Sequence, residues 1–86
     1  MRVPVLMPKL GYDMSAGRIV GWRKSPGEMV QRGEVLLEVE GDKATVDIEA
    51  IQSGTLVAIV HEAGAEVRVG EEIAYIMTVD NQEGPP

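Results

Sequence analysis

An internal repeat is the feature of this 86-residue chain that most restricts its fold. Shifting the sequence by 37 residues places 17–40 over 54–77 without a gap, and six of the 24 aligned positions are identical. The identical pairs are Gly17/Gly54, Val20/Val57, Gly27/Gly64, Val30/Val67, Gly33/Gly70 and Glu34/Glu71. Paired glycines mark places where each copy needs a positive φ or a close backbone approach. Two equivalent halves predict a β-sandwich or flattened barrel with pseudo-two-fold symmetry.

The amino-acid usage favours strands throughout the chain. There are 12 Val and 6 Ile but no Phe, and β-branched side chains fit a pleated sheet well. Ten glycines and five prolines interrupt the chain at short intervals, which leaves little room for helices. We therefore predict an all-β fold, a flattened barrel-sandwich of two four-stranded sheets. The predicted strands cover residues 3–7, 17–22, 29–30, 35–40, 44–50, 55–60, 66–67 and 73–79.

The composition excludes several classes of function. Cysteine is absent and His61 is the only histidine, so no thiolate or histidine metal site and no histidine-activated nucleophile is expected. A net charge of −6 disfavours nucleic-acid binding, and the basic spot at Arg23 and Lys24 is too small for phosphate. No apolar run approaches the length of a membrane span, and no signal peptide opens the chain. The composition predicts a soluble, non-enzymatic domain at 1–79, with 80–86 as the start of a flexible interdomain linker.

A hairpin at residues 35–49 contains the most informative pattern. With Asp42-Lys43 as a two-residue loop, Val39 pairs with Val46 and Leu37 with Ile48, and these side chains face inward. The same register places Glu38 opposite Asp47 and Glu40 opposite Thr45, all facing water. Lys43 is then left at the tip of the hairpin.

Two interpretations of Lys43 compete. An arbitrary turn lysine is simply solvated in roughly nineteen cases in twenty. Alternatively, the tip of a symmetric hairpin displays this lysine for covalent modification. An acidic collar surrounds it, consisting of Glu38, Glu40, Asp42 and Asp47. Like charges directly across two strands are destabilising, so the stability of the fold does not explain why Glu38 and Asp47 face each other.

The residues around Lys43 resemble a known family. The run Glu40-Gly41-Asp42-Lys43-Ala44, with Gly27 before it and Gly54 after it, is similar to the lipoyl domain of the dihydrolipoamide acyltransferase component of 2-oxo acid dehydrogenase complexes, most like that of pyruvate dehydrogenase. Other stretches that fit are Met7-Pro8-Lys9-Leu10-Gly11, Gly17-Arg18-Ile19-Val20-Gly21-Trp22, Gly33-Glu34-Val35-Leu36 and Val69-Gly70-Glu71-Glu72-Ile73-Ala74. The resemblance covers about residues 3–79. It departs at Gly41, where the family usually has Thr or Ser, and this loosens the turn.

The resemblance implies that Lys43 carries lipoate, attached as an amide by a lipoate ligase or lipoyl transferase that reads Glu40, Gly41, Asp42 and Ala44. The domain would be a swinging-arm carrier without catalytic residues or a metal. Its lipoyl group would be reductively acylated by a thiamine-diphosphate 2-oxo acid dehydrogenase, pass the acyl group to coenzyme A in the acyltransferase core of the parent chain, and be reoxidised by dihydrolipoamide dehydrogenase. The parent would be a dihydrolipoyllysine-residue acetyltransferase. The implied location is the bacterial cytoplasm, or the mitochondrial matrix in a eukaryote.

Two alternatives stay open from the sequence. A biotinyl carrier domain of a carboxylase shares the fold, but that family flanks its lysine with methionines, whereas Asp42 and Ala44 flank Lys43. An unmodified β-sandwich adaptor would instead bind partners through the loop at Tyr12 or through the acidic face.

The symmetry also predicts an irregular loop beside Lys43. Strand 3–7 should run toward the lysine end, and the connection that follows it, 8–16, is longer than the matched connection, 51–53. We predict that this loop recognises a partner protein; its residues are Leu10, Gly11, Tyr12, Asp13, Met14 and Ser15. The symmetry counterpart of Lys43 is Asp80, which places the linker at the opposite end of the domain.

Overall fold

The computed structural model describes residues 1–78, which form eight β-strands and no helix. The strands are β1 (Arg2–Leu6), β2 (Ala16–Trp22), β3 (Met29–Val30), β4 (Val35–Glu40), β5 (Thr45–Glu49), β6 (Gly54–Ile59), β7 (Glu66–Arg68) and β8 (Glu72–Thr78). The all-β prediction is confirmed. The predicted ends were slightly wrong, because Met7 lies beyond β1 while Ala44 and Ala50 flank β5. The predicted linker, 80–86, and the Asp80 counterpart of Lys43 lie outside the described residues.

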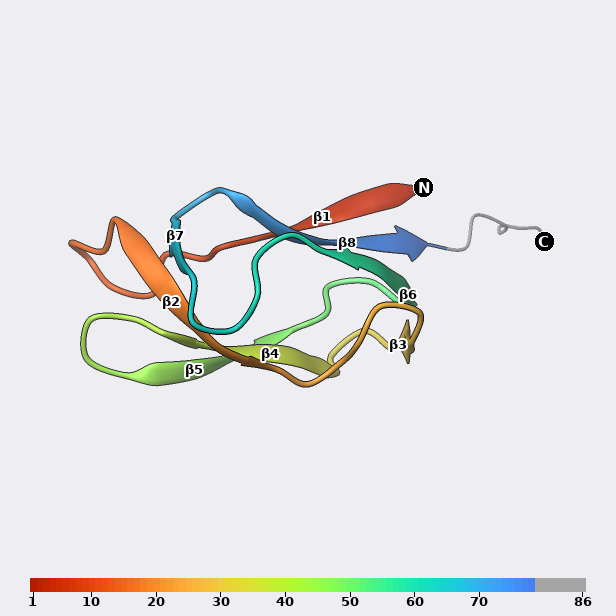
Figure 1. Cartoon of the computed structure of the whole chain (residues 1–86), viewed down its shortest axis with the longest axis horizontal. Helices are drawn as coiled ribbons and strands as arrows, with labels where there is room; N and C mark the ends of the chain where they lie inside the picture. Colours follow the sequence, from red (N-terminus) through yellow and green to blue (C-terminus); the bar gives the residue numbers. More distant parts are fainter. Residues whose placement is uncertain (79–86) are drawn as a thin grey trace.

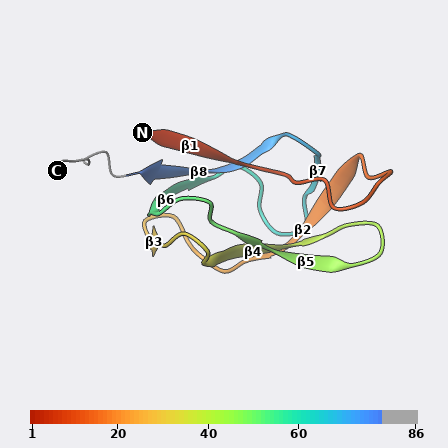
Figure 2. The same ribbon diagram turned by 180° about the vertical axis from the view of Figure 1, so that it is seen from behind.

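Two four-stranded antiparallel sheets pack against each other (Figures 1 and 2). One sheet has the order β1-β8-β6-β3 and the other β5-β4-β2-β7. The repeat relates β2, β3 and β4 to β6, β7 and β8, so one order maps onto the other and the predicted pseudo-two-fold is confirmed. The turn between β4 and β5 lies at the opposite end of the domain from the start of β1 and the end of β8 (Figure 1).

The symmetry extends to the irregularities of the strands. The β4–β5 pairing skips Leu36, and the β1–β8 pairing skips Ile73, the residue aligned with it in the repeat. Both side chains are fully buried. A bulge of this kind bends the strand and redirects a side chain, and here it adds one inward-facing residue to each sheet.

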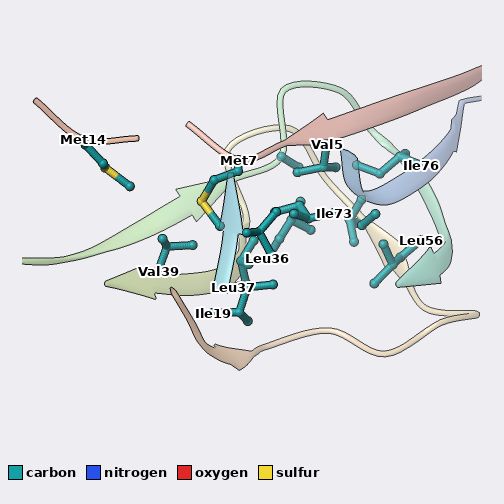
Figure 3. Packing of buried hydrophobic residues seen from close by; sticks show 14 residues of the cluster. Val5, Met7, Met14, Ile19, Leu36, Leu37, Val39, Leu56, Ile73 and Ile76 are labelled. Atoms are coloured by element: carbon teal, nitrogen blue, oxygen red, sulfur yellow. The ribbon is translucent and has the colours of Figure 1, made fainter. Parts of the chain in front are cut away.

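The core between the sheets is aliphatic (Figure 3). Its buried members are Val5, Met7, Met14, Ile19, Val30, Leu36, Leu37, Val39, Ala50, Leu56, Val67, Ile73, Ala74 and Ile76. Trp22 is half-buried at the margin of this cluster, and its Nε1–H donates a hydrogen bond to the carbonyl oxygen of His61 at 3.0 Å. With no buried polar or charged side chain among the described residues, the domain is stabilised chiefly by the close packing of aliphatic groups.

The matched glycines have the two roles that the sequence predicts. Gly27 and Gly64 have φ values of 97° and 94°, in the left-handed region that disfavours other residues. Gly33 and Gly70 have positive φ values as well. In the remaining pair, Gly17 and Gly54, the glycines instead allow close approach of neighbouring atoms. A Cβ atom on Gly54 would overlap the carbonyl oxygen of Met77 in β8, whereas one on Gly17 would lie 2.7 Å from the flexible Met14 Cε.

Gly54→Ala is therefore expected to destabilise the domain by about 2–3 kcal/mol, because backbone atoms of a central strand must move to admit the methyl group. For a domain of this size, that loss lowers the melting temperature by roughly 10–20 °C. Gly21→Ala is the matched control, since nothing lies within 4 Å of a Cβ at that strand position. Equal melting temperatures for the two variants, measured by circular dichroism, would contradict the close approach.

Candidate functional site

Lys43 lies at the tip of the β4–β5 hairpin. The Gly41 N–H donates a hydrogen bond to the Ala44 carbonyl oxygen at 2.9 Å, which leaves Asp42 and Lys43 as a two-residue loop. Beyond the turn, the predicted register is confirmed at all four pairs: Glu40↔Thr45, Val39↔Val46, Glu38↔Asp47 and Leu37↔Ile48. The site is thus held at the end of a ladder whose inward positions, Leu37 and Val39, are fully buried.

One inward position of the hairpin differs from the prediction. Val46 pairs with the buried Val39, yet its side chain is 37% exposed. Val46 lies on β5, the edge strand of its sheet, whereas the buried Val39 lies on the inner strand β4. The sequence pattern gave the correct face of the strand, but the extent of the core depends on contacts that the pattern does not contain.

Lys43 is chemically distinct from Lys24, a second lysine of the chain. Lys24 Nζ lies 2.9 Å from Glu34 Oε2. The hydrogen bond from Lys24 lowers the pKa of Glu34 and raises that of Lys24 itself. Within residues 1–78, the Lys43 side chain forms no ion pair and no hydrogen bond. Its exposed amine is therefore available to a modifying enzyme without breaking any contact.

Arginines from β2 and its C-terminal end neutralise much of the acidic collar. Arg18 pairs with Glu40, while Arg23 Nη2 lies 3.6 Å from Glu38 Oε1 and 3.8 Å from Asp47 Oδ1. The like charges that the sequence places across the two strands are thus bridged by one guanidinium. This corrects the conclusion that the Glu38–Asp47 pair has no reason in stability. Sequence reasoning missed the role of Arg23, because it did not predict that β2 pairs with β4.

The loop at 10–15 flanks the lysine, as the symmetry predicts (Figure 1). A groove of about 410 Å³ separates it from the hairpin tip. The lining residues are Leu10, Gly11, Tyr12, Asp13, Gly41, Asp42, Lys43, Ala44 and Val46.

The loop has an inward and an outward part. Met14 is buried in the core (Figure 3), and its Sδ accepts a hydrogen bond from the Leu10 N–H at 3.1 Å. Leu10 packs against the same cluster. Tyr12, in contrast, is 93% exposed, and Asp13 is exposed beside it. Of the six residues predicted to recognise a partner, Met14 instead anchors the loop, and Tyr12 and Asp13 provide its most outward surface.

Other kinds of site find no support in the described part of the chain. No three or more His, Cys, Asp or Glu side chains gather there as a metal ion would require. Residues 1–78 also contain no helix of the length and apolarity needed to cross a bilayer.

Comparison with known proteins matches this geometry to one family. The family model described as "Biotin-requiring enzyme", which covers biotin and lipoyl attachment domains, matches residues 3–76. Component 2 of the mitochondrial dihydrolipoyllysine-residue acetyltransferase of the Arabidopsis thaliana pyruvate dehydrogenase complex is 49% identical over 78 residues. That match covers 90% of this chain but 14% of the relative, so the chain spans about a seventh of the relative's length.

Two solved structures resemble the fold. The lipoyl domain of the 2-oxoglutarate dehydrogenase complex from Azotobacter vinelandii superposes with a TM-score of 0.74 at 28% identity, covering 87% of this chain and 95% of that one. Urea carboxylase from Kluyveromyces lactis superposes with a TM-score of 0.76 at 22% identity, covering 90% of this chain and 6% of that one. The second likeness concerns the fold alone. With a family model that matches nearly the whole described region, the chain belongs to the biotin–lipoyl attachment family.

Proposed function

We propose that this domain carries lipoate, bound as an amide to Nζ of Lys43, and presents it as a swinging arm. The observation that supports this most is the exposed Lys43 amine at the tip of a two-residue turn, without an ion-pair partner in the described residues. Lys43 is a suitable attachment point for lipoate, because forming the amide breaks no contact of the Lys43 side chain within residues 1–78. A groove with an apolar floor also lies beside it. When bound, lipoate would supply a disulfide that is reduced as one of its sulfurs takes up the acyl group as a thioester, from which the acyl group would pass to the thiol of coenzyme A.

The chain itself contributes presentation rather than catalysis. Tethering raises the effective concentration of the carrier group at successive active sites, typically to the millimolar range for a short flexible tether. The rigid hairpin fixes where the arm starts, and the turn residues Glu40, Gly41, Asp42 and Ala44 are the proposed footprint of the lipoate ligase or lipoyl transferase. The ion pairs of Arg18 and Arg23 hold the two strands below that footprint.

The parent protein is proposed to be the acetyltransferase component of a pyruvate dehydrogenase type of complex. The 49% identity to the Arabidopsis acetyltransferase exceeds the 41% identity to the succinyltransferase component of the 2-oxoglutarate dehydrogenase complex from Rickettsia conorii, and this favours the pyruvate type. The corresponding partners are a thiamine-diphosphate 2-oxo acid dehydrogenase, the acyltransferase core of the parent and dihydrolipoamide dehydrogenase. The proposed location is the bacterial cytoplasm or the mitochondrial matrix.

Intact-mass measurement distinguishes lipoate from biotin. After incubation with lipoate ligase, ATP and lipoate, the mass should rise by one lipoyl group, and peptide mapping should locate it at Lys43. Asp42 and Ala44 beside the lysine favour lipoate, because biotinyl domains have methionines there. A gain only with biotin ligase would move the assignment to a biotinyl carrier. No gain with either enzyme would favour an unmodified adaptor.

The exposed side of the loop is proposed to be read by the cognate dehydrogenase. Tyr12→Ser should slow reductive acylation of the lipoylated domain at least about tenfold, which corresponds to ~1.4 kcal/mol of lost recognition. Because Tyr12 is almost fully exposed, its removal should not change the melting temperature. The measurement is the acylation rate at equal concentrations of the lipoylated variant and parent.

Met29→Ser is the matched control, since Met29 is also an exposed apolar residue but lies in β3, at the far end of the domain (Figure 1). This variant should be acylated at the parent rate. Equal rates for both variants would make the loop a passive insertion and move the search for a recognition surface to Glu38, Glu40 and Asp47.

A further inference from the structure

The groove beside Lys43 has an apolar floor, to which the edge strand β5 contributes Val46. Val46 occupies an inward position of β5, paired with the buried Val39, but remains 37% exposed. Its counterpart in the other sheet, Val3, pairs with Ile76 and is half-buried. An apolar group that covers the exposed part of this side chain would remove both surfaces from water, which is favourable.

The long loop forms the second wall of this opening. Leu10 packs on the core from one side and lines the groove from the other. The Tyr12 ring and the Ala44 methyl group extend the apolar lining. At about 410 Å³, the groove falls within the roughly 300–1,000 Å³ typical of small-molecule sites. Lys43 is itself one of the lining residues, so a group attached to its side chain starts at the groove.

Charge determines what the groove can accept from Lys43. The free ammonium of Lys43 is strongly hydrated, and moving it onto the apolar floor would cost this hydration. Acylation of Nζ removes this charge and leaves an uncharged aliphatic chain. The same side chain that avoids the floor before modification can lie along it afterwards.

Resting on the proposed function, we propose that this groove seats the dithiolane end of the lipoyl group carried by Lys43. The arm then alternates between a docked position on its own domain and a free, extended one. A tethered group has an effective concentration in the millimolar range, so an intrinsic dissociation constant of about 1 mM gives roughly half occupancy. Such weak docking leaves the arm free to enter the active sites that it serves.

The test compares methyl and amide NMR spectra of the unmodified and lipoylated domains, with intact mass proving complete lipoylation. Docking predicts shift changes at Leu10, Gly41 and the Val46 methyls, and nuclear Overhauser contacts between the dithiolane protons and Val46. In Val46→Thr, which keeps the shape but adds a hydroxyl, the Leu10 shift change should fall to less than about half. Val57→Thr is the control, because Val57 is similarly exposed at 40% but lies in β6, in the other sheet.

The outcomes separate the inference from the function on which it rests. Full lipoylation with shift changes confined to 42–44 would overturn the docking while leaving the carrier function in place. Changes at Leu10 and Val46 that arise only when the dehydrogenase is added would likewise overturn it, because the groove would then belong to the partner. A domain that gains no lipoyl mass would overturn both.

Discussion

Replacing Lys43 with arginine is expected to abolish lipoylation completely while leaving the folded domain intact. The guanidinium cannot form the amide, and within residues 1–78 the Lys43 side chain makes no ion pair or hydrogen bond that arginine would lose. Surface substitutions of this kind change stability by no more than about 0.5 kcal/mol, so the melting temperature should stay within roughly 2–4 °C of the parent. Intact mass after ligase treatment and a thermal melt measure the two effects.

Lys9→Arg provides the control for this substitution. Lys9 is also exposed and lies next to the loop that flanks the hairpin, and its variant should gain one lipoyl group like the parent. Residual lipoylation of Lys43→Arg would show that another lysine serves as the attachment point. A large drop in melting temperature would contradict the exposed placement of Lys43.

Moving the lysine by one position should be almost as damaging. In Asp42→Lys with Lys43→Ala, the amine stays in the same two-residue loop, but successive side chains of a hairpin point in different directions. A misplacement of about 1 Å can cost a hundredfold in rate, and we expect at least that loss of lipoylation. The initial rate of mass gain with lipoate ligase is the measurement.

Asp42→Ala with Lys43 retained separates position from charge. This control removes the same carboxylate but keeps the lysine in place, and it should be lipoylated far faster than the shifted variant. Efficient modification at position 42 would mean that the ligase reads local sequence and not the geometry of the turn.

Local patterns of the sequence were sufficient to predict the fold and the register of the hairpin that has Lys43 at its tip. The repeat places glycines where the backbone requires them, and alternation on both arms of the hairpin fixes the register that displays Lys43. Both signals depend on residues close in sequence or on a fixed period of two. The symmetric bulges at Leu36 and Ile73 escaped prediction, because a consecutive apolar run does not reveal which residue is skipped.

Contacts between distant segments account for the rest. Arg23 follows β2, yet it bridges carboxylates on β4 and β5. Met14 stands between Asp13 and Ser15, and only the three-dimensional packing against Gly17 and Gly41 shows that it faces the core. The exposure of Val46 likewise depends on the position of β5 at the edge of its sheet. No period in the sequence carries this information.

The hydrogen bonds between the two halves have a consequence for the origin and assembly of such a domain. The Gly27 N–H donates to Leu56, and the Gly64 N–H donates to Ile19, so each repeat closes its turn on a strand of the other. Neither repeat has a complete sheet of its own, and a half-length chain would expose unpaired edges and half of the core. A half-length ancestor could satisfy these groups only as an intertwined homodimer with isologous contacts. Joining its two copies in one chain removes the concentration dependence of assembly. It also frees the end of the domain at the β4–β5 turn to diverge into a display site, while the start of β1 and the end of β8 lie at the opposite end.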